Sequence, residues 1–247
     1  AYPMPEYDAG EEIYPQLFSL IDEGIADIQN NSASNNLMPG NDDVIYNGNT
    51  SYWLAFANSL KLKMYNQVRL VSSMFNETAV NDLLSADLID LPAEDFEINY
   101  FNIPTPESRN PGYVEEYRDP SSYFYIDPWL YETMVDVNPE LPIGAVDPRI
   151  PYYWFNQLAP GGSTANNPEY QDDRFVSRIF SSDGTDHNAD ISDGATVLGI
   201  YPVGGRYDDG QGGRVTAQRE NSGTGAAPVR MLCSYDLYFI RAELALA

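Results

Sequence analysis

Residues 50–71 read TSYWLAFANSLKLKMYNQVRLV and carry the most regular apolar pattern in the sequence. The large apolar side chains recur every three or four positions, at Trp53, Phe56, Leu60, Met64, Val68 and Val71. This spacing predicts an α-helix with one apolar face, and Thr50 or Ser51 is expected to cap its N-terminus. Lys61, Lys63 and Arg69 are then expected to point toward solvent.

Three other segments also have helical patterns. Upstream, Glu11 and Glu12 precede an apolar series at three- and four-residue spacing, which predicts one buried stripe: Leu17, Leu20 or Ile21, Ile25 and Ile28. The polar run 30–36 is expected to end that helix. A shorter helix is expected over Glu77–Leu88. A fourth begins near Ser234 and carries Phe239, Ala242 and Leu246 on one face.

The helical rhythm is lost between about residues 89 and 230, where Pro and Gly recur every few residues. The apolar runs there are short and predict brief strands or turns: Phe96–Phe101, Tyr123–Ile126, Phe175–Phe180 and Val197–Tyr201. We therefore expect a mainly α fold with few short strands. Helical parts at 1–88 and 231–247 would flank a large irregular, loop-rich region at 89–230, all within one integrated domain.

The charge of the chain excludes several kinds of partner. Among 247 residues, 13 are Lys or Arg and 37 are Asp or Glu, which gives a net charge of −24. Such a chain repels phosphate backbones and anionic lipid, so we expect no nucleic-acid binding. With 43% hydrophobic residues, the composition is that of a folded protein. No apolar run approaches the ~18 residues that a membrane-spanning helix needs.

Residue chemistry offers few catalytic or metal sites. The single Cys, Cys233, excludes an internal disulfide and is expected to be a buried, inert thiol. The single His, His187, lies in an Asp-rich stretch at 183–194 that lacks the pattern of a calcium-binding EF-hand and is expected to form an unliganded turn. The Gly-rich stretch 204–213 is expected to be a surface turn, not a phosphate loop. We expect no cofactor and no metal. A glycosidase that uses two carboxylates stays chemically possible.

Aromatic residues are concentrated between residues 113 and 155. Flat rings with polar edges stack on sugars, while nearby Asp and Arg side chains supply hydrogen bonds. The alternative is that these rings pack irregular loops against one another. Trp129 is the first choice for a ligand-binding platform, and the other candidates are Tyr123, Tyr125, Trp154 and, in the Gly-rich stretch, Tyr207.

The order of several motifs resembles the SusD/RagB family of outer-membrane nutrient-binding lipoproteins of Bacteroidetes, in particular its SusD-like branch. The most specific pieces are FANSLKLK at 56–63, DPRIP at 147–151 and FIRAE at 239–243. DVIYNG at 43–48, PESRNPG at 106–112 and YPVGGRYDD at 201–209 add to the pattern. Together these motifs span nearly the whole chain.

The resemblance implies tetratricopeptide-like helix pairs that carry an irregular ligand-binding region. It also implies a non-catalytic protein that binds oligosaccharide or peptide as the lid of a SusC-like TonB-dependent transporter. Such a protein is attached to the cell surface by a lipid anchor that this chain lacks, so we expect the chain to be an internal piece of a longer one. The alternatives are a surface or secretion-associated interaction protein without nutrient binding, or an acidic glycosidase.

Overall fold

The computed structural model describes residues 4, 7–30, 39–115, 126–159, 161–162, 168–179, 181–182, 194–199 and 225–246, and the structural statements below concern these residues. The mainly α fold with a few short strands is confirmed, because the longest helix has 20 residues and the longest strand has four. None of the described helices has the length and apolarity required to cross a bilayer.

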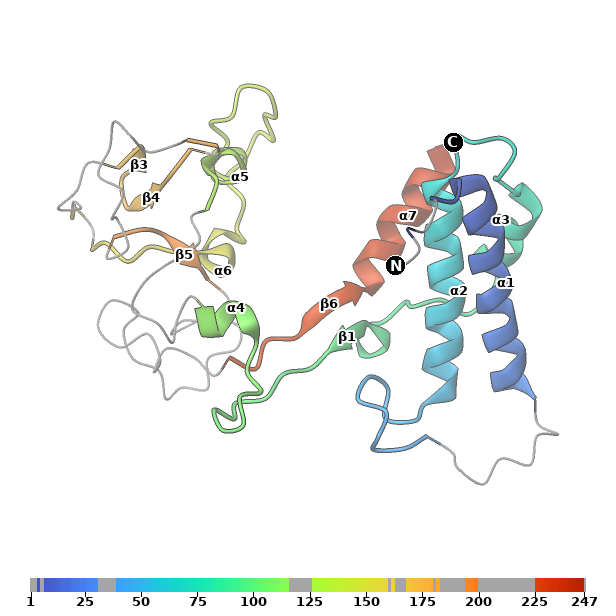
Figure 1. The fold of residues 1–247 in the computed structure, drawn as a ribbon. Helices are drawn as coiled ribbons and strands as arrows, with labels where there is room; N and C mark the ends of the chain where they lie inside the picture. The colour runs from blue at the N-terminus through green and yellow to red at the C-terminus, as the bar shows by residue number, and fades with distance from the viewer. Residues whose placement is uncertain are drawn as a thin grey trace. The chain divides into compact units, whose positions relative to one another are not determined.

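The chain divides into two compact units (Figure 1). The helical unit comprises Ala1–Asn99 and Val229–Ala247, and the inserted unit comprises Tyr100–Pro228. The sequence predicted the irregular region to begin near residue 89 and to end near residue 230. That these parts form one integrated domain stays a prediction.

Helix α2 (Thr50–Gln67) is the centre of the helical unit. It contacts α1 (Gly10–Gln29), α3 (Glu77–Leu84) and α7 (Ser234–Leu246), as Figure 1 shows. All four helices were predicted, although α3 ends at Leu84 and not at Leu88. Their shared core is built from buried apolar side chains at Leu62, Tyr65, Val80, Leu83, Leu88, Ile89, Leu232, Leu237 and Ile240.

The buried face of α2 differs from the predicted one. Leu62 is fully buried and Ser59, on the same face, accepts a hydrogen bond from the backbone N–H of Ile89 at 2.9 Å. Of the predicted stripe, Val68 is buried and Val71 is exposed, and the others are only partly buried: Trp53, Phe56, Leu60 and Met64. Three helices contact α2, so more than one of its faces is covered. The face that carries Ser59 and Leu62 lies against Ile89, in the segment after α3, and both this hydrogen bond and apolar packing hold it there.

Two expectations for α2 side chains were wrong. The N-cap is Asn49, not Thr50 or Ser51, and its side chain accepts hydrogen bonds from the backbone N–H groups of residues 51 and 52. The Lys61 side chain does not face solvent, since it is only 16% exposed and forms an ion pair with Asp22 of α1. An amine on a long stem can reach a carboxylate on the neighbouring helix while its methylene groups stay packed.

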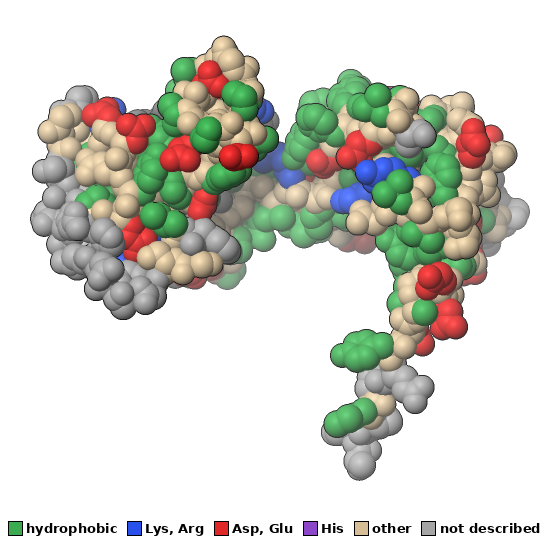
Figure 2. Space-filling model, turned by 90° about the horizontal axis from the view of Figure 1, so that it is seen from above, with side chains coloured by type: hydrophobic (Ala, Val, Ile, Leu, Met, Phe, Trp, Pro, Cys, Tyr) green, Lys and Arg blue, Asp and Glu red, His purple; other side chains and the backbone are tan. Residues whose placement is uncertain are grey.

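The predicted stripe of α7 is exposed, whereas that of α1 is only partly exposed. In α1 the side chains that turn toward the unit are Tyr14, Phe18, Ile21 and Ile25, whereas Leu17, Leu20 and Ile28 are exposed. In α7 the buried side chains include Leu237 and Ile240, while Phe239 and Leu246 are exposed. Figure 2 shows apolar side chains lying on the surface beside acidic ones.

A turn before α2 is organised by one carboxylate. Asp43 accepts hydrogen bonds from the backbone N–H groups of Ile45, Tyr46 and Gly48 at 3.0, 3.2 and 3.0 Å. It also accepts one from the indole Nε1–H of Trp53 at 2.7 Å. Burial alone would raise the pKa of Asp43, but these hydrogen bonds outweigh it and hold the pKa below its ordinary value.

Two short strands join the helical unit to the insertion. Strand β1 (Phe96–Ile98) follows the 3-10 turn η1 (Pro92–Glu94) and pairs antiparallel with β6 (Val229–Leu232). In this pairing Glu97 lies opposite Arg230. Cys233, directly after β6, is fully buried as predicted, and burial raises the pKa of its thiol to about 11.

The inserted unit contains short elements around small apolar clusters. Its helices are α4 (Pro111–Tyr113), α5 (Pro128–Met134) and α6 (Ile150–Tyr153). Strand β2 (Trp154–Phe155) pairs antiparallel with β5 (Val197–Leu198), and β3 (Tyr170–Asp172) pairs with β4 (Phe175–Ser177). Strands β1, β4 and β5 therefore lie in three of the four predicted apolar runs. Residues 123–125 of the remaining run lie outside the described part of the chain.

Candidate functional site

Trp129 lies in the first turn of α5 and is half exposed, with 50% of its surface accessible. The sequence DPW determines this position. The Asp127 carboxylate accepts a hydrogen bond from the backbone N–H of Trp129 at 2.8 Å, and Pro128 occupies the first helical position. A capped, proline-initiated turn limits the motion of the backbone, so the indole is presented from a rigid base.

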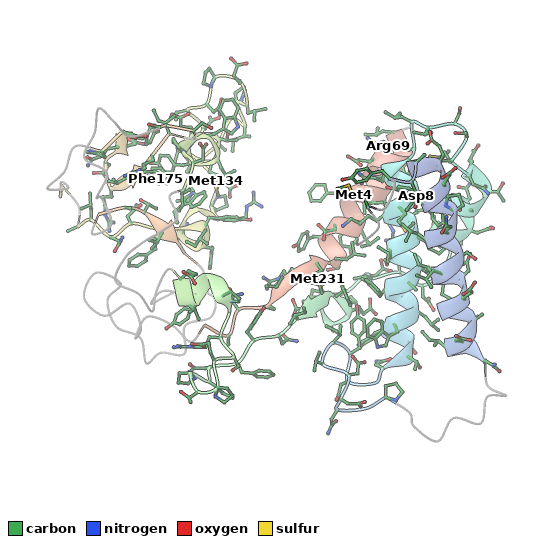
Figure 3. All side chains as sticks on the ribbon, viewed as in Figure 1. Met4, Asp8, Arg69, Met134, Phe175 and Met231 are labelled. Atoms are coloured by element: carbon green, nitrogen blue, oxygen red, sulfur yellow. The ribbon has the colours of Figure 1, made fainter. Side chains whose placement is uncertain are left out.

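The opposite side of α5 is packed. Met134 and Phe175 lie in one cluster with Trp154, and Figure 3 labels the first two. The ring of Tyr131 is stacked on Phe175 with centroids 3.8 Å apart, and its hydroxyl donates a hydrogen bond to Asp172 at 2.7 Å. Burial, helped by the carboxylate, raises the pKa of Tyr131. The phenol therefore remains a neutral donor.

Trp154 is part of this cluster and is only 7% exposed. Its ring meets Phe175 edge to face, with centroids 6.2 Å apart. Its Nε1–H has no hydrogen-bond partner among the described residues. In this conformation Trp154 supports α5 and α6 from within the core.

Two rings beside Trp154 are exposed instead. Tyr152 and Tyr153, the last residues of α6, have 56% and 41% of their surfaces accessible. The Arg149 guanidinium lies 5.7 Å from the centroid of the Tyr153 ring. We call Trp129, Tyr152, Tyr153 and Arg149 the exposed-ring group. The two helices that carry it share the Trp154 cluster, because Tyr131 and Met134 come from α5 and Ile150 from α6.

A bidentate ion pair fixes Arg149. Its Nε and Nη2 donate hydrogen bonds to the two carboxylate oxygens of Asp147 at 3.0 and 2.6 Å. Hydrogen bonds from the Arg149 side chain and backbone lower the pKa of Asp147 to about 2. The backbone N–H of Asp147 in turn donates to the carbonyl of Met134 at 2.7 Å, which ties the DPRIP segment to the end of α5. Asp147 is therefore an acceptor at neutral pH and not an acid catalyst.

The structure does not describe every predicted site residue. Tyr123, Tyr125 and Tyr207 lie outside the described ranges, as do the Asp-rich stretch 183–193 with His187 and the Gly-rich stretch 204–213. Within the described ranges, no group of three or more His, Cys, Asp or Glu side chains is arranged to hold a metal ion.

The predicted set did not include Tyr152, Tyr153 and Arg149, although the two Tyr residues lie in the aromatic-rich stretch. The local sequence carries no signal for the difference between these two rings and Trp154, because Trp154 begins β2, which pairs with the distant β5, whereas Tyr152 and Tyr153 end the preceding turn and face outward.

Comparison with known proteins places these features in context. A model of the SusD-like family, described as "Starch-binding associating with outer membrane", matches residues 1–247. No protein with a curated function matches the chain. Similar solved structures include a SusD homolog from Bacteroides uniformis, which is 19% identical with a TM-score of 0.60; the match covers 98% of this chain and 40% of that one.

Two further structures give the same result. A SusD homolog from Bacteroides ovatus is 20% identical with a TM-score of 0.56, over 97% of this chain and 40% of that one. A chitin-binding SusD homolog from Flavobacterium johnsoniae is 17% identical with a TM-score of 0.58, again over 97% and 40%. At these identities the likeness shows the fold. In all three matches the chain spans only 40% of the length of the relative.

Proposed function

The chain belongs to the SusD-like family, and from this premise we propose that it is part of a non-catalytic, cell-surface protein that binds oligosaccharide. The observation that carries the proposal is Trp129, a large ring held half exposed at a rigid helix start. Sugar rings present apolar C–H faces that stack on such side chains. The family description names starch, and one relative is chitin-binding.

Tyr152, Tyr153 and Arg149 would extend this platform. An exposed guanidinium donates hydrogen bonds to sugar hydroxyls, and its cation–π contact with Tyr153 together with its ion pair to Asp147 limits its rotamers. Less side-chain entropy is then lost when ligand binds. Tyr123, Tyr125 and Tyr207 stay in the proposal as further ring contributors. Trp154 would act from beneath, as support for the two helices.

Transport is the second part of the proposal. The protein would be held at the outer membrane by a lipid anchor and would cover a SusC-like TonB-dependent transporter, to which the helical unit would dock. The acidic charge of −24 disfavours a polyanionic nutrient. Peptide remains the alternative ligand class.

The binding test uses the full-length protein, with maltoheptaose and chitohexaose as separate titrants in calorimetry. The Trp129→Leu substitution removes the ring and keeps an apolar side chain. We expect the affinity for the bound sugar to fall about tenfold, which is the typical effect of losing one stacked aromatic ring. Phe239→Leu, at a 72% exposed ring of α7, is the matched control and should change nothing. Equal losses in both variants, or binding of neither sugar, would refute the platform.

The transport test is purification of the full-length protein from solubilised outer membrane, followed by identification of what co-purifies. A large TonB-dependent barrel is the expected partner. Recovery of the protein alone, or with secretion machinery, would remove the support for import and favour a surface interaction protein.

A further inference from the structure

An open pocket of about 590 Å³ lies entirely within the helical unit, outside the exposed-ring group. It is formed by the first turns of α1, the end of α2 and the segment that leads into α3. Figure 1 shows the start of α1 and the end of α2 at the same end of this unit. Its volume is within the range of roughly 300–1,000 Å³ found for ligand sites.

Aromatic rings line much of this pocket. Phe18 of α1 is stacked on Tyr65 of α2 with centroids 4.3 Å apart, and Tyr14 lies one turn earlier, 6.4 Å from Phe18. Phe75 adds a fourth ring from the segment before α3. The Tyr65 ring is buried, whereas Tyr14, Phe18 and Phe75 are partly exposed. Part of the surface of each of these three rings is therefore accessible at the pocket.

The charged residues that line the pocket within the described part of the chain are negative. Glu11 and Glu77 line it from α1 and α3, and none of the described lining residues is Lys, Arg or His. The N-terminus of α3 adds a partial positive charge of about half a unit, which is less than the two full negative charges of these carboxylates. Rings combined with carboxylates are the surroundings that stabilise an organic cation, and a guanidinium in particular both stacks on rings and pairs with carboxylates.

The neighbouring face of α1 indicates that the cation belongs to a protein. Ile13 and Leu17, each one position before a ring of the pocket, are about 40% exposed and form an apolar strip along the helix. A free amine would leave this strip uncovered, whereas a peptide segment could place aliphatic side chains on it. A second copy of this chain is disfavoured by its own charge of −24.

We propose that this pocket binds an Arg or Lys side chain, flanked by aliphatic residues, from a partner protein. The site uses only residues of the helical unit and does not depend on sugar binding. Trp129→Leu should therefore leave it unchanged.

The test is calorimetry of the full-length protein with the peptide N-acetyl-Gly-Leu-Arg-Leu-Gly-amide. A second peptide carries citrulline in place of Arg, which keeps the shape and removes the charge. We expect the Arg peptide to bind, and the citrulline peptide to bind about tenfold more weakly or not at all, as the loss of a cation–π contact and an ion pair requires. Raising the salt concentration should weaken the binding of the Arg peptide but not that of the citrulline peptide.

Matched variants locate the site. Glu11→Gln combined with Glu77→Gln should lower the affinity for the Arg peptide about fivefold to tenfold. Glu12→Gln makes the same charge change one position along α1, outside the pocket lining, and should alter affinity less than twofold. Circular dichroism checks that all variants are folded, and Glu11→Gln alone serves if Glu77→Gln disturbs α3.

Several results would overturn the proposal. They are the absence of Arg-peptide binding at millimolar concentration, equal affinity for the citrulline peptide, and an equal loss from Glu12→Gln. Binding of free n-butylguanidinium as tightly as the peptide would also overturn it, because the occupant would then be a small cation and not a protein segment.

Discussion

Replacing Asp43 should destabilise the helical unit far more than its position in a surface turn suggests. Each of its two carboxylate oxygens accepts two hydrogen bonds. Oδ1 accepts from the N–H groups of Ile45 and Tyr46, while Oδ2 accepts from Gly48 and from the indole of Trp53. In Asp43→Asn one oxygen becomes an NH₂ group, so one pair of donors then faces a donor.

The magnitude follows from the number of donors. Asp43 is only partly buried, so each lost partner is taken near the lower limit, at about 1 kcal/mol. Asp43→Asn should therefore lower the free energy of unfolding by about 2 kcal/mol, and Asp43→Ala, which removes all four acceptor contacts, by about 4 kcal/mol. Asp42→Asn is the control, because Asp42 carries the same charge and, within the described part of the chain, accepts a hydrogen bond from the N–H of Gly40 alone.

The measurement is urea unfolding of the full-length protein followed by circular dichroism, at pH 7 and at pH 3. The pKa of Asp43 is lowered in the folded state from an ordinary value of 3.8. Its stabilising effect is therefore complete above that value and is lost as the pH falls through the folded pKa. The difference between wild type and Asp43→Asn should shrink at pH 3. A loss no larger than that of Asp42→Asn, or one that stays unchanged in acid, would refute this account of the turn.

Three other predictions test the helical unit. Leu62→Ala should lower the free energy of unfolding by about 2–5 kcal/mol, whereas Leu70→Ala, at a residue 87% exposed, should change it by less than about 0.5 kcal/mol in the same urea assay. Gly48→Ala should lower the free energy of unfolding by about 1–3 kcal/mol, because Gly48 has φ +80° and a Cβ would lie 2.3 Å from the Pro39 carbonyl oxygen. Gly24→Ala, inside α1 with nothing within 4 Å of the new Cβ, should instead raise it by about 0.5–1 kcal/mol. A change of the same sign in both variants would contradict this. The thiol of Cys233 should react with Ellman's reagent at pH 8 only as fast as the protein unfolds, since it is buried and its pKa is raised to about 11, and rapid labelling of the native protein would show otherwise.

Helix positions were predictable from the sequence, whereas the faces they bury were predicted less well. In α2 the largest apolar side chains define one stripe, but the helix has neighbours on several sides and its most buried positions include the small polar Ser59. Hydrophobic spacing carries no information about a backbone N–H on a distant loop that needs an acceptor. The same limit explains why the α7 stripe and part of the α1 stripe are exposed, because periodicity identifies an apolar face but not what it packs against.

In the inserted unit, composition predicted the aromatic region but not which rings are exposed. Trp129 lies inside the proline-initiated first turn of α5 and Trp154 follows the proline-containing turn of α6, yet the first is half exposed and the second lies in a core cluster. The difference arises because Trp154 begins β2, whose pairing with β5 turns its side chain inward against Phe175. That pairing joins segments about forty residues apart, so local sequence cannot reveal it.

The antiparallel pairing of β1 with β6 means that the insertion leaves and re-enters the scaffold at adjacent points, with Ile98 opposite Val229. To the scaffold, residues 100–228 are equivalent to the loop of a hairpin. A hairpin loop can lengthen, shorten or be exchanged at little cost to the strands that hold it, because the entropy of closing a loop grows only slowly with its length. Evolution could thus graft a new recognition surface between these two strands while the helices beneath keep their sequence and their core.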